Sequence, residues 1–328
     1  MSSSKAKKLA RKAETALANE HLATVKRANA LADPLAPVAP MLMSFELESI
    51  GGAGAGAEAE TACPVCVVGA SAASLAPATL EAAHALCRAN MEALYEPVWG
   101  PWDAAKKRQQ LSDGASRFLL AYAPAAPAAA AGKGAPAPAT ATGGGDGGGP
   151  APSSADSRSP EDQEGGRRPP AAREQGEELV GLLNYRFELD DAGGTGRGLP
   201  TPAAYCYELQ LSARARRRGL GRRLMRVLEL AAARAGMRAV ILTVLDANAA
   251  ARALYAGLGY SLDPNSPDPE DADEAHAGYR ILRKDFPEAV VAASRRAAEM
   301  EAAKAAAGAG AAAAGGGGAA VAAAAAAR

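Results

Sequence analysis

The sequence is poor in aromatic side chains, which make up 4% of its 328 residues. Its hydrophobic fraction is 48%, but 87 residues are alanine, so only about a fifth of the chain carries a larger apolar side chain. Large aliphatic and aromatic side chains supply most of the area that a protein core buries. The composition therefore supports one ordinary α+β domain with long additional segments, and it argues against two full domains.

Cysteine and histidine are also scarce, at 4 and 3 residues. Four cysteines in a chain of this length do not form a disulfide framework. Cys63 and Cys66 have the spacing of half a zinc site, but no second pair of cysteines or histidines accompanies them. We therefore expect no metal.

Strongly apolar runs of about 20 residues, which a membrane span needs, are absent as well. The longest candidate, 305–327, consists almost entirely of alanine and glycine. The N-terminus is basic at positions 5, 7, 8, 11 and 12 and lacks the apolar stretch of a secretory signal. We expect no membrane association and a location in the nucleus and cytoplasm, with the basic residues as an import signal. A solvated helix face would have the same pattern.

The 36 basic and 36 acidic residues cancel, so no overall charge attracts nucleic acid and we expect no direct nucleic-acid readout. Composition divides the chain into a basic helical segment (1–40), one domain (41–286) and a low-complexity Ala/Gly-rich tail (287–328). Within the domain, 51–73, 124–176 and 192–202 read as disordered loops, because they hold too few large apolar residues to offset the entropy of ordering.

The remaining segments alternate between helical and strand periodicity. In chain order they predict a helix at 4–31, a strand at 41–48, helices at 77–96 and 103–111, strands at 117–122, 179–189 and 204–211, a helix at 219–235, a strand at 239–244, a helix at 249–258, and strands at 260–262 and 279–284. The long segment 124–176 lies between two predicted strands. It is therefore expected as an expanded hairpin loop, whose closure costs little extra entropy with length.

The most informative run follows the predicted strand 204–211. The basic turn Arg216-Arg-Arg-Gly-Leu-Gly221 leads directly into an amphipathic helix. Glycines let backbone N–H groups approach an anion, and the start of a helix adds unpaired donors. The turn predicts a pyrophosphate cradle, although a basic loop that caps a surface helix would have the same letters. Asn248 and the segment Tyr255-Ala-Gly-Leu-Gly-Tyr260 follow downstream.

Together these motifs resemble the GNAT superfamily of acyl-CoA-dependent N-acyltransferases. The resemblance implies a GNAT fold, in which helices flank a mostly antiparallel sheet with a splayed pair of parallel strands. It also implies acetyl-CoA as co-substrate. The residues expected to contact it are Leu209, Gln210, Leu211, Arg216, Arg217, Arg218, Gly219, Leu220, Gly221, Arg222, Asn248 and Tyr255.

Further motifs resemble the N-terminal acetyltransferase D family, which acetylates the α-amine of histones 4 and 2A. They are Asn90-Met-x-x-Leu-Tyr95-Glu, Trp99-Gly-x-Trp102, Tyr185-Arg-Phe-Glu188 and Tyr205-Cys-Tyr-Glu208-x-Gln-Leu. The resemblance implies histone tails that begin Ser-Gly-Arg-Gly as substrates and partners, and the ribosome as a further partner.

An α-amine has a pKa of about 7.7–8.0, so a carboxylate suffices as its base. The resemblance places this base at Glu208 and gives Tyr255 a catalytic role. An ordinary strand glutamate facing solvent is the alternative. By strand alternation, Glu208 lies on the face opposite Tyr205 and Tyr207 unless a bulge intervenes, and the GNAT fold implies a bulge on this strand.

The resemblance further implies a peptide pocket that combines aromatic and acidic side chains. Its predicted residues are Tyr95, Trp99, Glu188, Asp190, Tyr205, Tyr207, Thr243 and Tyr279. Glu188, Asp190, Asp191 and Asp263 would surround an arginine of the peptide and pair with it. Two other functions stay open: acetylation of another protein N-terminus, a lysine or a small amine, and a non-enzymatic chromatin or RNA adaptor that uses the basic N-terminal segment.

Overall fold

A computed structural model describes residues 3–31, 43–47, 63–125, 176–191, 199–268, 277–300 and 303. Its elements are α1 (Ser3–Ala30), β1 (Ser44–Leu47), β2 (Cys63–Ser71), η2 (Ala72–Ser74), α2 (Pro77–Trp99), α3 (Ala104–Ser112), β3 (Arg117–Pro124), β4 (Glu177–Asp190), β5 (Thr201–Leu211), η3 (Ala213–Ala215), α4 (Leu220–Arg234), β6 (Ala239–Leu245), α5 (Ala249–Ala256), β7 (Ser261–Leu262) and β8 (Tyr279–Asp285). Residues 288–300 are helical as well. Every helix and strand that periodicity predicts is confirmed.

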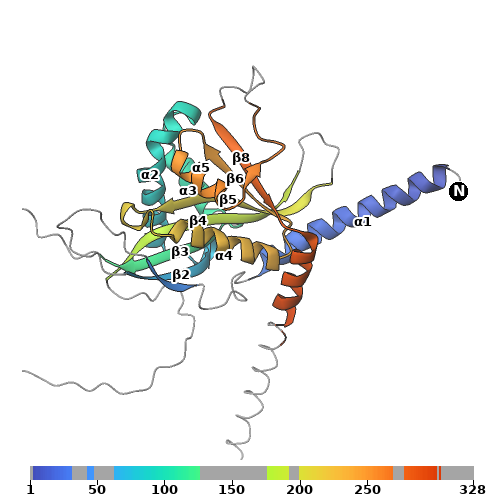
Figure 1. Cartoon of the computed structure of the whole chain (residues 1–328), viewed down its shortest axis with the longest axis horizontal. Helices are drawn as coiled ribbons and strands as arrows, with labels where there is room; N and C mark the ends of the chain where they lie inside the picture. The colour runs from blue at the N-terminus through green and yellow to red at the C-terminus, as the bar shows by residue number, and fades with distance from the viewer. Residues whose placement is uncertain are drawn as a thin grey trace, which may run out of the picture.

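The strands form one sheet in the order β1-β2-β3-β4-β5-β6-β8-β7 (Figure 1). Neighbouring strands are antiparallel except β5 and β6, which run parallel. These two strands pair only where 203–206 lies beside 239–242, although β5 continues to Leu211 and β6 to Leu245. The predicted mixed sheet with a splayed parallel pair is therefore confirmed.

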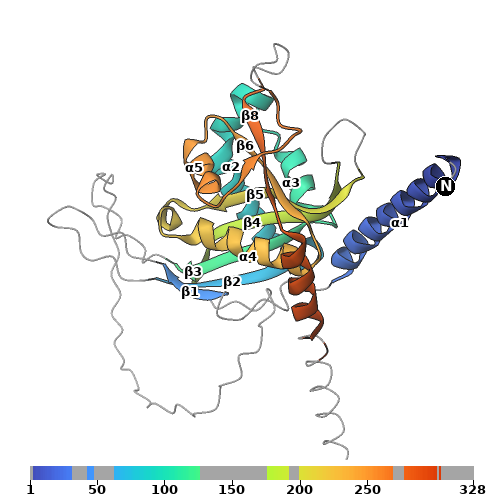
Figure 2. The same cartoon turned by 45° about the vertical axis from the view of Figure 1, so that its right-hand side comes forward.

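Helices cover both faces of the sheet (Figures 1 and 2). Phe118, Leu120 and Leu182 are fully buried in the core that the sheet shares with α2 and α3. Their strand neighbours Leu119 and Leu183 belong to the opposite core, shared with α1 and α4. Because side chains alternate between the faces of a strand, burial on both faces explains why β3 is an uninterrupted apolar run.

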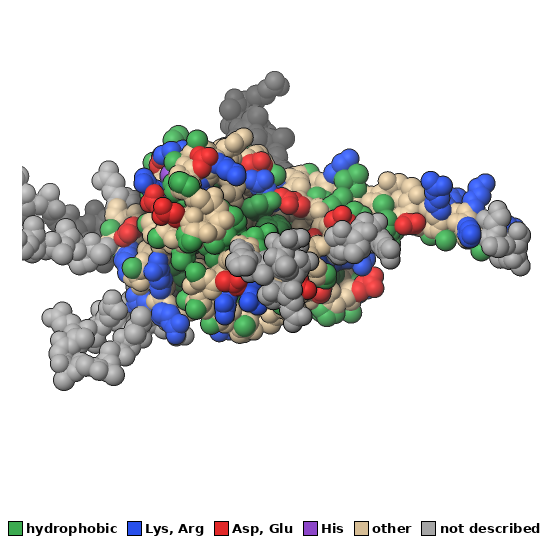
Figure 3. Space-filling model, turned by 90° about the horizontal axis from the view of Figure 1, so that it is seen from above, with side chains coloured by type: hydrophobic (Ala, Val, Ile, Leu, Met, Phe, Trp, Pro, Cys, Tyr) green, Lys and Arg blue, Asp and Glu red, His purple; other side chains and the backbone are tan. Residues whose placement is uncertain are grey.

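The two halves of α1 differ in their surroundings. Val25 and Ala28 pack into the core beside α4, whereas every residue of 5–17 is exposed. This first half extends away from the rest of the molecule, and its lysine and arginine side chains are visible along the projecting end in Figure 3. It is a basic, solvated helix that projects from the domain.

Two segments predicted as low-complexity contain regular structure. Strand β2 lies within 51–73. It forms because Val65 and Val67 are buried, with 1% and 2% of their surface exposed, in a strand that pairs with β1 and β3. Helical residues 288–300 lie within the predicted tail, where Val291 is buried. In addition, Thr201 and Pro202 already belong to β5. The predictions for 51–62, 126–175, 192–198 and nearly all residues beyond 300 concern positions outside the described residues.

None of the helices in the described part of the chain is long and apolar enough to cross a membrane.

Candidate functional site

A bulge in β5 sets which side chains enter the site. Tyr185 of β4 pairs with Cys206 and Asn184 pairs with Glu208, so Tyr207 has no partner in β4. An extra residue in one strand reverses the face that later residues occupy. Cys206 packs into the core shared with α1 and α4, yet Glu208 faces α2 and α3. The predicted bulge is confirmed, and it brings Glu208 onto the face of Tyr205.

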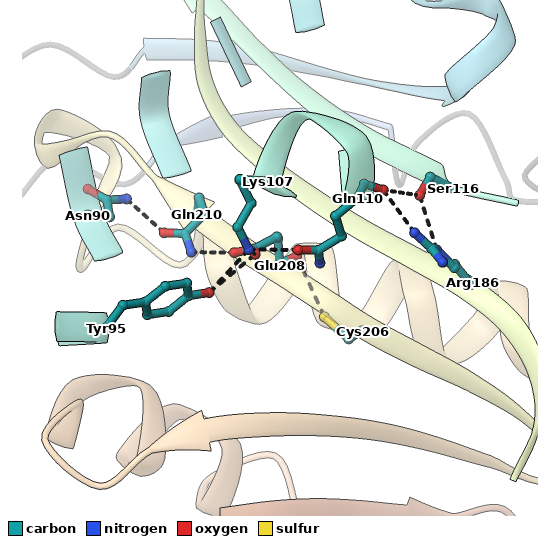
Figure 4. Close-up of polar contacts among 9 residues, drawn as sticks. All are labelled: Asn90, Tyr95, Lys107, Gln110, Ser116, Arg186, Cys206, Glu208 and Gln210. Atoms are coloured by element: carbon teal, nitrogen blue, oxygen red, sulfur yellow. Dashed lines mark hydrogen bonds and ion pairs between the residues drawn. The ribbon is translucent and has the colours of Figure 1, made fainter. Parts of the chain in front are cut away.

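Glu208 is a buried carboxylate, with 3% of its surface exposed. Its Oε1 accepts a hydrogen bond from Lys107 Nζ at 2.6 Å, and its Oε2 accepts one from Gln210 Nε2 at 2.8 Å. The Tyr95 hydroxyl lies 3.5 Å from Oε1 (Figure 4). The alternative of a strand glutamate facing solvent is therefore wrong.

Lys107, on α3, is a site residue that the sequence analysis did not single out. Its ammonium also donates to Gln110 Oε1 at 2.8 Å and to the Tyr95 hydroxyl at 3.3 Å. It belongs to the run Lys106-Lys107-Arg108, which by itself reads as a charged surface. The available signal was Leu111, which is fully buried and, four residues later, lies on the same helical face.

A second chain of hydrogen bonds joins Glu208 to the basic turn. Asn90 Nδ2 donates to Gln210 Oε1 at 2.9 Å and to the Leu211 carbonyl at 3.1 Å. Arg216 Nη2 donates to Asn90 Oδ1 at 2.5 Å. The side chains of Gln210 and Arg216, both predicted to contact acetyl-CoA, are thus held within the protein's own network. Their direct contact with a cofactor stays a prediction.

Two tyrosines and a threonine that were predicted to line the peptide pocket lie in contact with one another. The hydroxyls of Tyr205 and Thr243 are 2.5 Å apart, and the Tyr205 and Tyr207 rings are 4.8 Å apart. The Tyr207 hydroxyl donates to Glu188 Oε1 at 2.9 Å, while the Arg186 guanidinium lies 4.7 Å from the centre of the Tyr207 ring. The structure brings the four predicted residues among these into one contiguous group.

Three further predicted residues form an aromatic row from α2 to β8. The Tyr95 and Trp99 rings meet edge to face with 4.7 Å between their centres, and Trp99 lies 5.8 Å from Tyr279. Trp99 is 50% exposed, which is unusual for so large an apolar side chain. Trp99 is thus an exposed aromatic side chain that contacts Tyr95, whose hydroxyl lies 3.5 Å from Glu208 Oε1.

Asp190, predicted to bind an arginine of the peptide, already has a partner in the chain. Arg283 Nη1 donates to Asp190 Oδ2 at 2.5 Å and to Asp263 Oδ2 at 3.3 Å. Burial raises the pKa of Asp190 even though Arg283 opposes this shift. Glu188 and the exposed Asp191 are the predicted carboxylates that Arg283 does not contact in the described residues.

The basic turn has the backbone geometry of an anion site. Arg217 and Gly219 have left-handed φ angles of 62° and 80°, and Gly219 begins α4 without a side-chain cap. A Cβ on Gly221 would lie 3.3 Å from Leu254 Cδ2 and 3.4 Å from Leu211 Cδ1. The first glycine therefore permits the turn, and the second permits α4 to begin close to α5 and β5. Uncapped N–H groups at a helix start suit a pyrophosphate.

A known family model covers the part of the chain that contains this turn. Residues 149–260 match the model of the Acetyltransferase (GNAT) family. The matched range is about a third of the chain, and the mixed sheet with its flanking helices is the GNAT fold. The matched range includes β4, β5, α4, β6 and α5, and therefore both the Arg216–Gly221 turn and Glu208.

Solved acetyltransferase structures resemble the chain at low identity. The NatC complex bound to Gag peptide and CoA is 12% identical over 67% of this chain and 99% of the other, with a TM-score of 0.35. NAA60 of Arabidopsis thaliana with a bisubstrate analogue is 13% identical over 68% and 99%, with a TM-score of 0.35. The ribosomal-protein-S18-alanine N-acetyltransferase of Escherichia coli is 16% identical over 67% and 93%, with a TM-score of 0.33.

The remaining residues that were predicted to contact the cofactor differ in how far their side chains are buried. Leu220 is fully buried, Leu209 and Leu211 pack against the core, and Arg218 is buried. Arg222 donates to the Gly257 carbonyl at 3.3 Å. The leucines can therefore meet a ligand only through their backbone or the partly exposed edge of the side chain.

Asn248 and Tyr255 belong to the start and body of α5. Asn248 Oδ1 accepts from the Ala251 N–H at 3.1 Å and so caps the helix. Tyr255 is 6% exposed, and burial, together with the nearby Cys206 and Glu208, raises the pKa of its hydroxyl well above the usual value. The Tyr255 hydroxyl is therefore neutral in the folded protein, and its catalytic role stays a prediction.

Among the residues that the structure describes, no group of three or more His, Cys, Asp or Glu side chains could hold a metal. Cys66 is exposed, whereas Cys87 and Cys206 are buried. Burial and the Glu208 carboxylate raise the pKa of the Cys206 thiol. Since the thiolate is the nucleophilic form, Cys206 is not suited to carry an acyl group.

We predict that iodoacetamide at pH 8 alkylates Cys66 but neither Cys87 nor Cys206 in the folded protein, because the buried thiols are protonated and inaccessible. Peptide mass mapping after timed quenching measures the modification at each site. The same reaction in urea should modify all three, which controls for peptide recovery. Modification of Cys206 as fast as Cys66 without urea would show that the thiol is reactive.

Proposed function

We propose that this protein is an N-terminal acetyltransferase that acetylates the α-amine of histones 4 and 2A, which begin Ser-Gly-Arg-Gly. The observation that carries the proposal is the buried Glu208 carboxylate, which lies at the β5 bulge between an anion-binding turn and a partly exposed group of aromatic side chains. The resemblance of the surrounding motifs to the N-terminal acetyltransferase D family supports the choice of acceptor.

The residues of the turn fit acetyl-CoA, the co-substrate that a GNAT domain uses. When bound, it supplies the acetyl group as an activated thioester. The backbone of Arg216–Gly221 and the start of α4 would hold its pyrophosphate. Beyond Cys206, β5 no longer pairs with β6, so backbone groups on that edge of β5 are open to an extended ligand.

Two groups of the chain can move the protons of this reaction. The acceptor amine must lose a proton to become nucleophilic, and Glu208 can take it directly or through one water. We propose Tyr255 as the group that gives a proton to the departing sulfur, the catalytic role that the resemblance assigns to it. Direct attack of the amine agrees with the protonated, buried state of Cys206.

The acceptor side supports a peptide whose third residue is arginine. Glu188 is the carboxylate nearest the tyrosine group, since it accepts the Tyr207 hydroxyl. Asp190 would have to leave Arg283 to join it. We further propose histone tails and the ribosome as partners, and a location in both nucleus and cytoplasm, for which the exposed basic half of α1 is the support.

A panel of acceptors tests the proposed function. The full chain is incubated with acetyl-CoA and one of four acceptors: a Ser-Gly-Arg-Gly peptide, a Ser-Gly-Ala-Gly peptide, an N-terminally blocked lysine peptide, and spermidine. Mass spectrometry should show acetylation of the free α-amine, reduced by about ten- to a hundredfold in efficiency when alanine replaces the arginine. Acetylation of the blocked lysine peptide or spermidine alone would overturn it, and acetyl-CoA binding with no product would favour an adaptor.

The turn gives a first prediction for binding. Gly219→Val should weaken acetyl-CoA binding by about tenfold or more, because a β-branched residue is strained at a φ of 80° and its side chain would stand at the start of α4. Titration calorimetry measures the affinity, and circular dichroism checks the fold. Gly114→Val is the matched control, since Gly114 has open space around it and no left-handed φ. Equal affinity in both folded variants would contradict the cradle.

The carboxylate gives a second prediction for turnover. Glu208→Gln should lower kcat by about a hundredfold with acetyl-CoA affinity unchanged, because the amide keeps the shape but cannot accept the proton. Steady-state rates from pH 6.5 to 9 measure the effect. Glu92→Gln, which alters an exposed ion pair on α2, should leave kcat near the wild-type value. Wild-type turnover of Glu208→Gln across this range would assign the base elsewhere.

A further inference from the structure

Lys107 and Glu208 form a buried ion pair. Their atoms Nζ and Oε1 are 2.6 Å apart, and the two side chains are 9% and 3% exposed. The pair joins α3 to β5 across 101 positions of sequence. Removing two charges from water costs desolvation free energy. Attachment of α3 does not require this cost, because Leu111 already packs into the core.

The ammonium of Lys107 is held in one place. Its three hydrogens are donated to Glu208, Gln110 and the Tyr95 hydroxyl, all within 3.3 Å. The rings of Tyr95 and Trp102 lie 5.1 and 5.8 Å from Nζ, within the range of cation–π attraction. Figure 4 shows Lys107, Gln210 and Tyr95 gathered around the carboxylate of Glu208. These contacts fix both the cation and the rotamer of the carboxylate.

The other groups that face Glu208 do not supply positive charge. Cys87 and Tyr95 approach from α2, Cys206 from its own strand and Tyr255 from α5, and each is neutral or would become negative. Burial lowers the pKa of His84, which interacts with Lys107. On β4, Arg186 lies 3.3 Å from Asp113 instead. Within the described residues, Lys107 is the cation that contacts Glu208.

A buried carboxylate without a cation tends to take up a proton, because burial disfavours its charged form. A protonated Glu208 could not accept a proton from an acceptor amine. We propose that Lys107 is a positioning residue for the transfer reaction, which keeps Glu208 ionised and oriented so that it can act as the base. The inference rests on the proposed function.

The proton balance of the step is simple. An N–H bond of the acceptor ammonium breaks and an O–H bond forms at Glu208, which becomes neutral. Lys107 keeps all its protons and acts only through the carboxylate. Its removal should therefore affect the reaction through the protonation of Glu208, with the greatest loss at low pH.

The pH dependence of kcat/KM separates this role from a structural one. Lys107→Met should cost about tenfold or more at pH 6.5 and much less at pH 9, with the acidic limb displaced upward by about one pH unit or more. Lys107→Arg, which retains the charge, should keep a limb close to wild type. Lys106→Met, at the exposed neighbouring position, is the matched control. Lys107→Met in a Glu208→Gln background should add little further loss.

A measurement without turnover reads Glu208 directly. Carbon-13 NMR of protein labelled at glutamate carboxyls follows the titration, and Glu208→Gln identifies the signal by its loss. The midpoint should rise in Lys107→Met, and in Lys107→Gln if the methionine variant does not fold. An unchanged midpoint, or a kinetic loss equal at every pH, would overturn the inference. An upward shift in a protein that acetylates no acceptor would overturn the proposed function while supporting the role of Lys107.

Discussion

The extra residue in β5 is the constraint on which the site depends. Without the bulge at Tyr207, strand alternation would turn Glu208 toward α1 and α4, into the apolar core that Cys206 joins and away from Lys107. With it, one strand presents Tyr205 and Glu208 on the same face and then runs directly into the basic turn. A local irregularity of one residue thus places Glu208 beside the tyrosines on the strand that leads to the basic turn.

The acidic residues of the site differ in whether they have a cationic partner. Glu208 is paired with Lys107 inside the core, and Asp190 with Arg283 nearer the surface. Both pairs join segments about a hundred positions apart in sequence. A carboxylate that is already paired gains little from a new cation, and Glu188 instead accepts a hydrogen bond from the neutral Tyr207 hydroxyl.

Some of this site could be predicted from the sequence, and the reasons are local. The turn at 216–221 is only six residues long. Its glycines indicate from the sequence alone a backbone that bends sharply or is closely approached by another group. The bulge was predicted by resemblance, because nothing in the letters of Tyr205-Cys-Tyr-Glu208 reveals an unpaired residue. Lys107 was not assigned, because three consecutive basic residues read as a charged surface, and only the position of Leu111 four residues later indicates which of them faces inward. Strand β2 was missed because its short apolar run, Val65 to Val68, follows a long stretch of alanine and glycine.

The hairpin of β3 and β4 has a consequence for how the chain tolerates its long internal segment. Pro124 pairs with Glu177, and the Ala125 N–H donates to the Gly176 carbonyl at 2.6 Å. Arg214, just before the basic turn, donates to the Pro124 carbonyl at 2.7 Å and lies 3.1 Å from Glu178. The chain leaves β3 at Ala125 and returns to β4 at Gly176, and these two residues are joined by one hydrogen bond. The β3–β4 pairing therefore sets the register of β4, whatever the number of residues between Ala125 and Gly176. The length of chain between Ala125 and Gly176 can therefore vary beside the basic turn without changing the register of β4.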